Sequence, residues 1–288
     1  MQQEKETQKI TKKLWFKLCV IFLAVLTFVG AVLGVLQLGC IYTEKSWEHW
    51  KPNYEKVDIK SLIYKDELTD DDYQTLYYQT GFTKLAIDDL RAGHLHSRIL
   101  QMQEFLFAEH ELIVDHFAPF TYIEEIEAEA PMAVLKDGDI IVSATTRVSW
   151  WRYGHAALVT NGEQNRLVES LSPGVNSATS HARTFADFEN FMILRPKVDD
   201  EIKEQVVAYA ETSLIDLPYE MTTGILSRKK AETIKKTQCA HLVWHSYYKH
   251  GIDLDSNGGM IVKPQDIALS PHVEVVQAFG FNLDTLWS

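Results

Sequence analysis

A long run without charge near the N-terminus limits the possible folds of this chain more than any other feature. From Leu18 to Thr43 the sequence has no charged residue, and most of its side chains are apolar. About 20 apolar residues in a helix cross the hydrocarbon core of a bilayer. The run therefore predicts one transmembrane helix over residues 18–43, followed by a long polar part of the chain.

The residues on either side of this run indicate its orientation. Residues 1–17 contain five lysines against two glutamates, and lysines that flank a membrane span favour the cytoplasmic side. Aromatic residues at both ends, including Trp15 and Trp47, suit the two membrane interfaces. We therefore expect a single-pass membrane protein with a cytoplasmic basic tail at residues 1–17 and an extracytoplasmic domain after the span.

Two other fates of this segment are alternatives to an anchor. A cleaved signal peptide has an apolar core of roughly 7–15 residues and a small-residue cleavage site, whereas this run is longer and shows no clear site of that kind. Leu38-Gly39-Cys40 is similar to a bacterial lipoprotein processing site, although Gln37 stands where an aliphatic residue is usual. A retained helix agrees better with the length of the run.

The composition of the whole chain excludes several classes of protein. The chain has 288 residues, 46% of them hydrophobic, and a formal net charge of −12. This share of hydrophobic residues is typical of a globular domain and excludes a disordered or fibrous chain. The acidic balance argues against a nucleic-acid partner, which would require a basic surface. Three cysteines are too few for a disulfide scaffold.

Local patterns after the span predict a connector at residues 44–60 and then a mainly helical part at residues 61–130. Thr69 is a candidate N-cap with Asp72 three residues later, and Gly81 is a candidate stop. Two further helices are expected over residues 83–93 and 97–116.

Residues 131–288 change to short β-rich runs and two helices, which predicts an α+β domain with an antiparallel sheet. One helix is expected over Asp200–Ile215. Another is expected over Gln238–His250, with Thr237 as its N-cap and Gly251 just past its end. The expected strands are Asp139–Ala144, His155–Thr160, Arg166–Ser170, Phe191–Arg195 and Val273–Ala278.

Cys239 is the only cysteine outside the apolar run, because Cys19 and Cys40 both fall within it. It begins an expected helix, where backbone N–H groups and the helix dipole favour a thiolate. A thiolate nucleophile also needs a base, usually a histidine that a third polar group orients. A small, buried and inert side chain is the alternative interpretation of this cysteine.

His155 and Glu169 are the candidates for the base and the orienting group. His155 begins an expected strand whose other members are small or apolar, and Glu169 lies in the next strand. Adjacent antiparallel strands would place the carboxylate beside the imidazole, where it fixes the tautomer and stabilises the imidazolium. Each residue alone also fits a structural histidine or a solvated glutamate.

Three segments around these candidate residues form a joint pattern: Leu135-Lys136-Asp137-Gly138-Asp139-Ile140-Ile141, then Gly154-His155-Ala156-Ala157-Leu158-Val159 with Val168-Glu169-Ser170, and Cys239-Ala240-His241-Leu242-Val243-Trp244. Together they resemble the NlpC-type, papain-like cysteine hydrolases in circularly permuted form, as in YiiX-like and YebB-like proteins. In the unpermuted enzymes the cysteine helix precedes the histidine strand, and here the histidine comes first. Leu217-Pro218-Tyr219 is similar to the Gly-x-Pro-Tyr element of the same superfamily.

This resemblance implies a permuted papain-like catalytic domain at residues 131–288 that uses no cofactor. It implies Cys239 as nucleophile, His155 as base and Glu169 as orienting residue. Tyr219 would stabilise the oxyanion together with the backbone N–H of Cys239. The chain departs from the family where Gln238 replaces the usual Asp and Ala240-His241 replace Ser-Gly, and where the basic stretch 220–237 is longer.

Two patterns superficially indicate metal binding, and we expect no metal at either. Asp253-x-Asp255-x-Asn257-Gly258 matches the first half of an EF-hand loop, but Pro264 stands at the twelfth position in place of Glu. His241 and His245 have the spacing of zinc proteases, but Leu242 stands where the glutamate belongs. The basic run at residues 228–236 is expected to be a solvated loop face, with contact to anionic lipid headgroups or wall polymers as the alternative.

These features predict a membrane-anchored thiol hydrolase, an amidase or peptidase that acts through a thioester. Its expected substrate is a cell-wall peptide or a lipid-linked amide. One alternative is a lipid acyltransferase on the same fold, which the anchor and the Trp150-Trp151 pair suggest. The other is a catalytically silent binding domain at the membrane surface.

Overall fold

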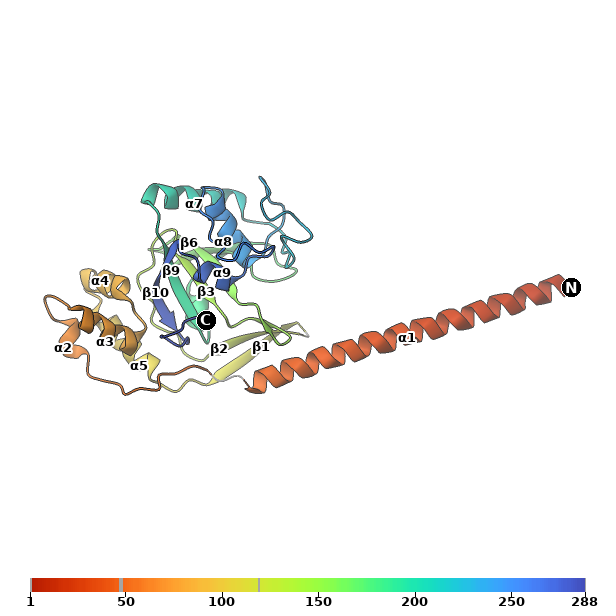
Figure 1. Cartoon of the computed structure of the whole chain (residues 1–288), viewed down its shortest axis with the longest axis horizontal. Coiled ribbons are helices and arrows are strands. Elements are labelled where there is room, and N and C mark those ends of the chain that lie inside the picture. Colours follow the sequence, from red (N-terminus) through yellow and green to blue (C-terminus); the bar gives the residue numbers. More distant parts are fainter. Residues whose placement is uncertain (1, 47–48, 119, 288) are drawn as a thin grey trace.

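The computed structural model describes residues 2–46, 49–118 and 120–287, so the expected interfacial Trp47 lies outside the described residues. A long N-terminal helix, α1 (Gln2–Ser46), projects from a mixed α+β body that contains two antiparallel sheets (Figure 1). The α+β class and the antiparallel pairing expected from the sequence are confirmed.

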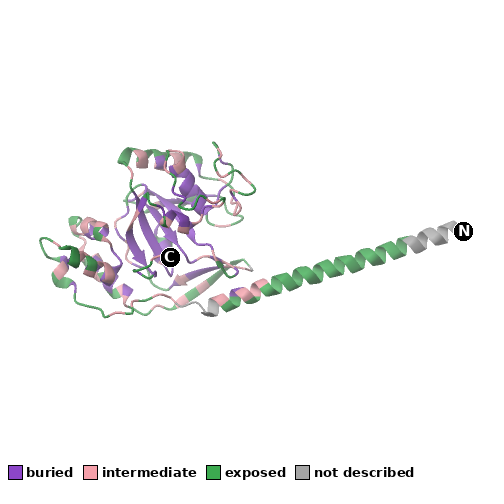
Figure 2. Ribbon diagram, viewed as in Figure 1, coloured by how far each residue is buried: buried purple, intermediate pink, exposed green. Residues whose placement is uncertain are grey.

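Helix α1 is exposed along most of its length and touches the body only near its C-terminal end (Figure 2). Its segment Thr11–Thr43, with a mean hydropathy of 2.8, is long and apolar enough to cross a membrane. This segment contains the expected span, and the helix continues past it on both sides. No proline interrupts the run, so every interior backbone group can bond within the helix.

A six-stranded sheet forms the centre of the body, and all of its neighbouring strands are antiparallel. The strand order is β10-β9-β3-β6-β7-β8. Its central strands are buried on both faces, which explains why they are apolar almost without interruption. The strands are β3 (Ile140–Ser143), β6 (His155–Asn161), β7 (Arg166–Glu169), β8 (Ala178–His181), β9 (Phe191–Pro196) and β10 (Val273–Phe279).

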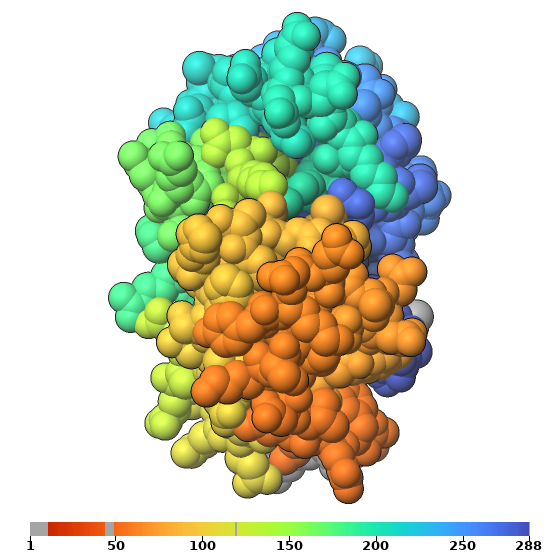
Figure 3. Space-filling model, turned by 90° about the vertical axis from the view of Figure 1, so that its left-hand side faces the viewer, coloured from red at the N-terminus to blue at the C-terminus, as the bar shows by residue number. Residues whose placement is uncertain are grey.

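Helices cover both faces of this sheet, so two hydrophobic clusters lie on opposite sides of it. One face packs against α7 (Asp200–Ser213), α8 (Cys239–Tyr248) and α9 (Pro264–Ala268). The other face packs against α3 (Asp70–Thr80), α4 (Lys84–Ala92) and α5 (His96–Leu106). The short helices are α2 (Lys60–Ile63) and α6 (Arg183–Ala186), and the orange elements α2–α4 lie on the side of the body away from α1 (Figure 3).

A smaller sheet in the order β1-β2-β4-β5 lies beside the C-terminal end of α1 (Figure 1). Several contacts join it to the helix, among them a hydrogen bond of 3.8 Å from Cys40 Sγ to the Phe120 carbonyl. Ser149 Oγ donates to the Leu36 carbonyl at 3.2 Å, and Gln37 Nε2 donates to the Tyr122 hydroxyl at 3.2 Å. A Cβ atom on Gly39 would lie 2.3 Å from the Trp150 ring, so only glycine admits the indole there. The strands are β1 (Leu112–Ala118), β2 (Thr121–Ile126), β4 (Arg147–Val148) and β5 (Trp151–Arg152).

The structure corrects the sequence-based elements mainly between residues 97 and 130. Helix α5 ends at Leu106 instead of His116, and the β1–β2 hairpin occupies a stretch that we expected to be helical. Cross-strand pairing overrides local propensity there, since β1 gains its hydrogen bonds from β2. The capping box of Thr69 with Asp72 and the left-handed Gly81 are as expected.

Candidate active site

Strands β6 and β7 bring His155 and Glu169 together. Ala157 pairs directly with Glu169 across the two strands, and His155 lies two residues before Ala157 on the same face. The small Ala157 side chain leaves room above it, so the two longer side chains meet diagonally. His155 Nε2 donates to the Glu169 carboxylate with a separation of 2.5 Å.

The residue before the histidine must be a glycine. Gly154 has a φ of +80°, and a Cβ atom there would lie 2.5 Å from the Ser143 carbonyl oxygen. Ser143 pairs with His155 at the start of β6. Only glycine therefore allows the chain to enter β6 so close to β3.

Phe185 of α6 fixes the plane of the imidazole. Its ring stacks on the His155 ring with 5.4 Å between the centroids and 16° between the planes. The His155 side chain is buried by Phe185 on one face and held at Nε2 by Glu169. The ring is thus oriented before any substrate binds.

Cys239 approaches this pair from helix α8, of which it is the first residue. Cys239 is 2% exposed, and its Sγ donates to Gln238 Oε1 at 3.3 Å. Cys239 and His155 line the same small pocket, and the interaction with Cys239 is among the causes that raise the pKa of His155.

The electrostatics of the three residues favour a charged pair. Burial alone would lower the pKa of His155, but hydrogen bonds with Cys239 and Glu169 and their negative charges raise it to about 10. Burial acts to raise the pKa of Glu169, but the hydrogen bond and positive charge of His155 hold it below its ordinary value. Glu169 is therefore ionised, and His155 binds a proton more readily than a free imidazole does.

Two tyrosines lie close enough to Cys239 to sense its charge. Burial first, and then the charge of Cys239, raises the pKa values of Tyr219 and Tyr153, so both phenols stay protonated. Tyr219 was expected at this position, whereas Tyr153 was missed. The Tyr153 hydroxyl is buried with no hydrogen-bond partner among the described residues, so it is a donor available to a ligand.

The thiol and imidazole line a small enclosed pocket of about 40 Å³. Its walls include Thr121 and Ile123 of β2 and, farther along the chain, Leu171 and Met221. A cavity of this volume admits only a few water molecules. The described conformation is therefore a closed one, with the reacting groups shielded from bulk solvent.

Helix α8 starts differently from the sequence-based expectation. Gln238, not Thr237, is the N-cap, and its Oε1 accepts a hydrogen bond from the Ala240 N–H at 2.9 Å. Gln238 Nε2 donates to the Val262 carbonyl at 2.7 Å, which fixes the orientation of the amide. The residue that departs from the family pattern therefore positions both the helix and the thiol.

The zinc-like pair on α8 serves to hold a loop. His241 and His245 each bind a backbone carbonyl through Nε2, that of Lys229 at 3.0 Å and that of Ala231 at 2.9 Å. Burial is the first cause that lowers the pKa of both, that of His241 to about 4. Among the residues that the structure describes, no group of three His, Cys, Asp or Glu side chains could hold a metal ion.

The basic run at residues 228–236 is not simply a solvated face. The Lys229 side chain is 11% exposed, and its ammonium group binds Asp255, a carboxylate of the EF-hand-like stretch. It also donates to the Gly259 carbonyl at 2.7 Å and lies 4.9 Å above the Trp244 ring. Lys229 therefore fastens the loop to the turn that follows α8, which corrects the expectation for this residue.

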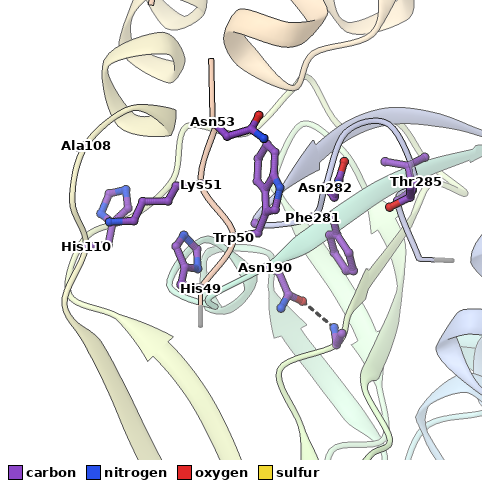
Figure 4. A pocket seen from close by; sticks show the side chains of 13 residues that line it. His49, Trp50, Lys51, Asn53, Ala108, His110, Asn190, Phe281, Asn282 and Thr285 are labelled. Carbon is purple, nitrogen blue, oxygen red and sulfur yellow. Dashed lines mark hydrogen bonds between the residues drawn. The ribbon is translucent and has the colours of Figure 1, made fainter. Parts of the chain in front are cut away.

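A second and larger groove of about 920 Å³ lies between the juxtamembrane segment and the C-terminal segment (Figure 4). Its lining includes His49, Lys51, His110 and Asn282. Burial, and then the charge of Lys51, lowers the pKa of His49 to about 4, so its ring is neutral. None of the lining residues is a cysteine, whereas Cys239 lines the smaller pocket.

Sequence reasoning missed three residues of the smaller site. Tyr153 lies two positions before His155, so its place beside the base was a usable signal. Gln238 was noted only as a departure from the family pattern, and its donor and acceptor contacts follow from the cap geometry. Phe185 comes from a four-residue helix, and nothing in the sequence indicates that it meets His155.

Comparisons with known proteins find a distant similarity. The chain is 27% identical over 130 residues to the uncharacterized protein YycO of Bacillus subtilis (strain 168), a match that covers 44% of this chain and 50% of YycO. The chain thus aligns with about half the length of that relative. No family model matches the chain, and no solved structure matches it.

Proposed function

We propose that this protein is a membrane-anchored cysteine hydrolase whose body is a permuted papain-like domain. The observation that carries the proposal is that Cys239 and His155 line one small pocket, with 2.5 Å between His155 Nε2 and the Glu169 carboxylate. A nucleophile at a helix N-terminus, a base that touches it and a group that orients the base form the arrangement that thiol catalysis requires. The order in the chain, histidine before cysteine, is that of the permuted group.

The proposed reaction cleaves an amide in two steps. His155 Nδ1 takes the Cys239 proton, and the thiolate adds to the amide carbonyl, whose oxyanion receives hydrogen bonds from Tyr219 or the Cys239 N–H. The imidazolium then protonates the leaving amine, which leaves a thioester on Cys239. Water adds to the thioester as His155 takes one of its protons, and departure of the acid with return of that proton restores the thiol.

The anchor and its orientation belong to the same proposal. Helix α1 would span the membrane with its lysine-rich end in the cytoplasm, which places the catalytic body outside it. Cell-wall peptides and lipid-linked amides are the amide substrates available at such a surface. The length and apolar character of α1 support the anchor, and the lysines support the orientation.

Replacement of the nucleophile tests the proposal. Cys239→Ala should lower kcat/KM on an amide substrate by about 10⁴-fold or more, because no other group can form the thioester. Cys40→Ala is the matched control, since Cys40 is also buried but lies in α1 away from the pocket. Unchanged turnover by Cys239→Ala on a substrate that the unaltered protein cleaves would refute the hydrolase.

One observation favours a second candidate, transfer of the acyl group to a lipid acceptor. The closed pocket is walled mainly by apolar side chains such as Ile123, Leu171 and Phe188, which disfavours entry of water as the acceptor. Product analysis with acyl lipids and an amine or alcohol acceptor distinguishes the two. Free acid alone supports hydrolysis, a new ester or amide supports transfer, and no reaction together with no selective alkylation of Cys239 indicates a silent binding domain.

A further inference from the structure

Helix α1 is attached to the body at a defined level along its length. Leu36 and Gln37 bind Ser149 and Tyr122, and Gly39 lies against Trp150. Cys40, one residue later, is completely buried. These contacts fix the position of the body along the axis of α1.

Under the proposed anchorage, that level would coincide with the end of the hydrocarbon core. Lys17 is the last charged residue before the apolar run, and about 20 helical residues at about 1.5 Å each cross the hydrocarbon. Counted from Leu18, the core therefore ends near Leu38. The body touches its anchor where hydrocarbon gives way to lipid headgroups.

Large apolar side chains are exposed on the same side of the body. We call five of them the apolar lip: Phe117 is 42% exposed, Leu171 40%, Trp150 and Trp151 each 54%, and Leu226 78%. In Figure 1 the β1–β2 hairpin and the light-blue loop around residue 226 both lie on the side toward which α1 projects. Monomeric soluble proteins rarely expose such groups together, and tryptophan is enriched at membrane interfaces.

The lip adjoins the pocket that contains Cys239, because two of its five residues also line that pocket. Phe117 and Leu171 also line that pocket, and the Trp151 ring lies 6.0 Å from the ring of Tyr153 inside it. Leu226 lies five residues after Met221, which lines the pocket. Exposed basic residues flank the loop, at Arg228 and Lys235, where anionic headgroups would attract them.

We propose that the apolar lip rests in the headgroup region of the bilayer that α1 spans, so that the Cys239 pocket opens directly onto lipid. The inference rests on the proposed anchorage by α1 and not on the proposed chemistry. A bilayer fits this surface because the lip lies on the side of the body toward which α1 projects (Figure 1), and its Trp150 also contacts the anchor at Gly39. An amphiphilic substrate would then enter sideways from the membrane without crossing bulk water.

Site-directed spin labelling of the full chain tests the lip. The protein is placed in nanodiscs of phosphatidylethanolamine with a minority of phosphatidylglycerol, and a nitroxide is attached to one cysteine at a time. Leu226→Cys and Trp151→Cys report on the lip, native Cys19 reports on the anchor, and Tyr64→Cys is the matched control. Tyr64 is 60% exposed and follows α2, on the side of the body away from α1. The other native cysteines are replaced by alanine.

Collision of each label with oxygen and with a soluble nickel chelate gives the depth. The proposal predicts a ratio of oxygen collisions to nickel-chelate collisions that is several-fold higher for the labels at Leu226, Trp151 and Cys19 than for the label at Tyr64. Lip labels that match Tyr64 while Cys19 stays in lipid would overturn the lip and leave the anchor standing. A Cys19 label in water would remove the anchor and the lip together. Lip labels shielded from both agents would indicate a protein cover and also overturn the proposal.

Discussion

At the scale of single residues, the candidate site depends on small side chains as much as on reactive ones. Ala157 leaves the space in which His155 meets Glu169, and Gly154 allows β6 to start beside β3. Phe185 and Gln238 hold the imidazole and the thiol in place. The reactive groups are thus oriented by residues that take no part in the proposed chemistry.

Removal of the charge on Glu169 should weaken the base. Glu169→Gln keeps a polar side chain but loses the negative charge that helps raise the pKa of His155 to about 10. The imidazolium pairs with the thiolate only below that pKa, so the alkaline limb of activity should move to lower pH. We expect kcat/KM to fall by about 10²-fold or more. A pH profile of activity and of iodoacetamide alkylation of Cys239 measures both effects.

Glu211→Gln is the control for that experiment. Glu211 forms a partly exposed ion pair with Arg166 of β7 at 2.7 Å, outside the pocket. Its profile should match that of the unaltered protein. Equal profiles for Glu169→Gln and Glu211→Gln would contradict the role of Glu169.

Substitution of Gly154, the residue before His155, tests whether β6 starts as close to β3 as the structure shows. Gly154→Ala should destabilise the protein more than Gly174→Ala by about 1–3 kcal/mol, because both glycines have positive φ but only Gly154 faces a close carbonyl. Denaturant unfolding of the two variants in the same detergent measures the difference. Equal free energies of unfolding would show that the approach of β6 to Ser143 is not tight.

At the scale of elements, the sequence predicts the centre of the large sheet better than its surroundings. The buried strands β3, β6 and β9 are continuous apolar runs, and α7 and α8 have clear helical patterns. β8 has the sequence Ala-Thr-Ser-His and is mostly exposed, so no apolar signal marks it. The candidate residues Cys239, His155, Glu169 and Tyr219 could be named from the sequence, because their local motifs are intact.

The supporting residues could not be named in the same way. Phe185 reaches the site only through tertiary packing, and the β1–β2 hairpin is defined by cross-strand pairs. Residues of β1 are largely exposed, so its sequence lacks the alternation that identifies a strand. Such features depend on neighbours that are distant in the sequence.

A buried charge cluster joins the two sheets and gives a prediction at this scale. Arg152 binds both carboxylate oxygens of Glu124, at 2.6 and 2.8 Å, and also the Ala144 carbonyl at 2.9 Å. Arg152→Met should cost about 1–3 kcal/mol of unfolding free energy, because it removes two hydrogen bonds from the buried Glu124 carboxyl group, which keeps Arg147 as a partner. Arg166→Met, which breaks the partly exposed pair with Glu211, should cost about 0–1 kcal/mol. Urea unfolding of both variants checks the contrast.

The contact between His241 of α8 and the preceding loop predicts that the stability of the fold decreases at acid pH. The pKa of His241 in the folded protein is about 4, against an ordinary value of 6.5, so the unfolded chain binds more protons between these values. The His241 contribution to stability is therefore full above pH 6.5 and declines as pH falls toward 4. His241→Gln should make the unfolding midpoint less sensitive to pH in this window. The exposed His272→Gln should leave that sensitivity unchanged, and equal slopes for both variants would contradict the prediction.

At the scale of the whole molecule, the body and α1 share a contact that glycine makes possible. Gly39→Leu should push Trp150 away from α1 and loosen the body from the helix, because a Cβ atom at this position would lie only 2.3 Å from the ring. Gly34→Leu is the matched control, since a Cβ atom on Gly34 of the same helix would meet no other atom within 4 Å. Hydrogen exchange at Ser149 and its neighbours should rise in the first variant alone. Equal exchange in both would show that the contact is not tight in the bilayer.

The contact between α1 and the small sheet also links the anchor mechanically to the closed pocket. Strand β2 supplies Thr121 and Ile123 to the pocket wall, and Tyr122 between them holds Gln37 of α1. A bilayer that is thinner or thicker than the apolar run tilts a spanning helix. Such tilting would act on the pocket wall through Tyr122, so membrane thickness would set how often the thiol becomes accessible. Under the proposed anchorage and function, the rate of the proposed reaction would depend on the protein and the surrounding lipid together.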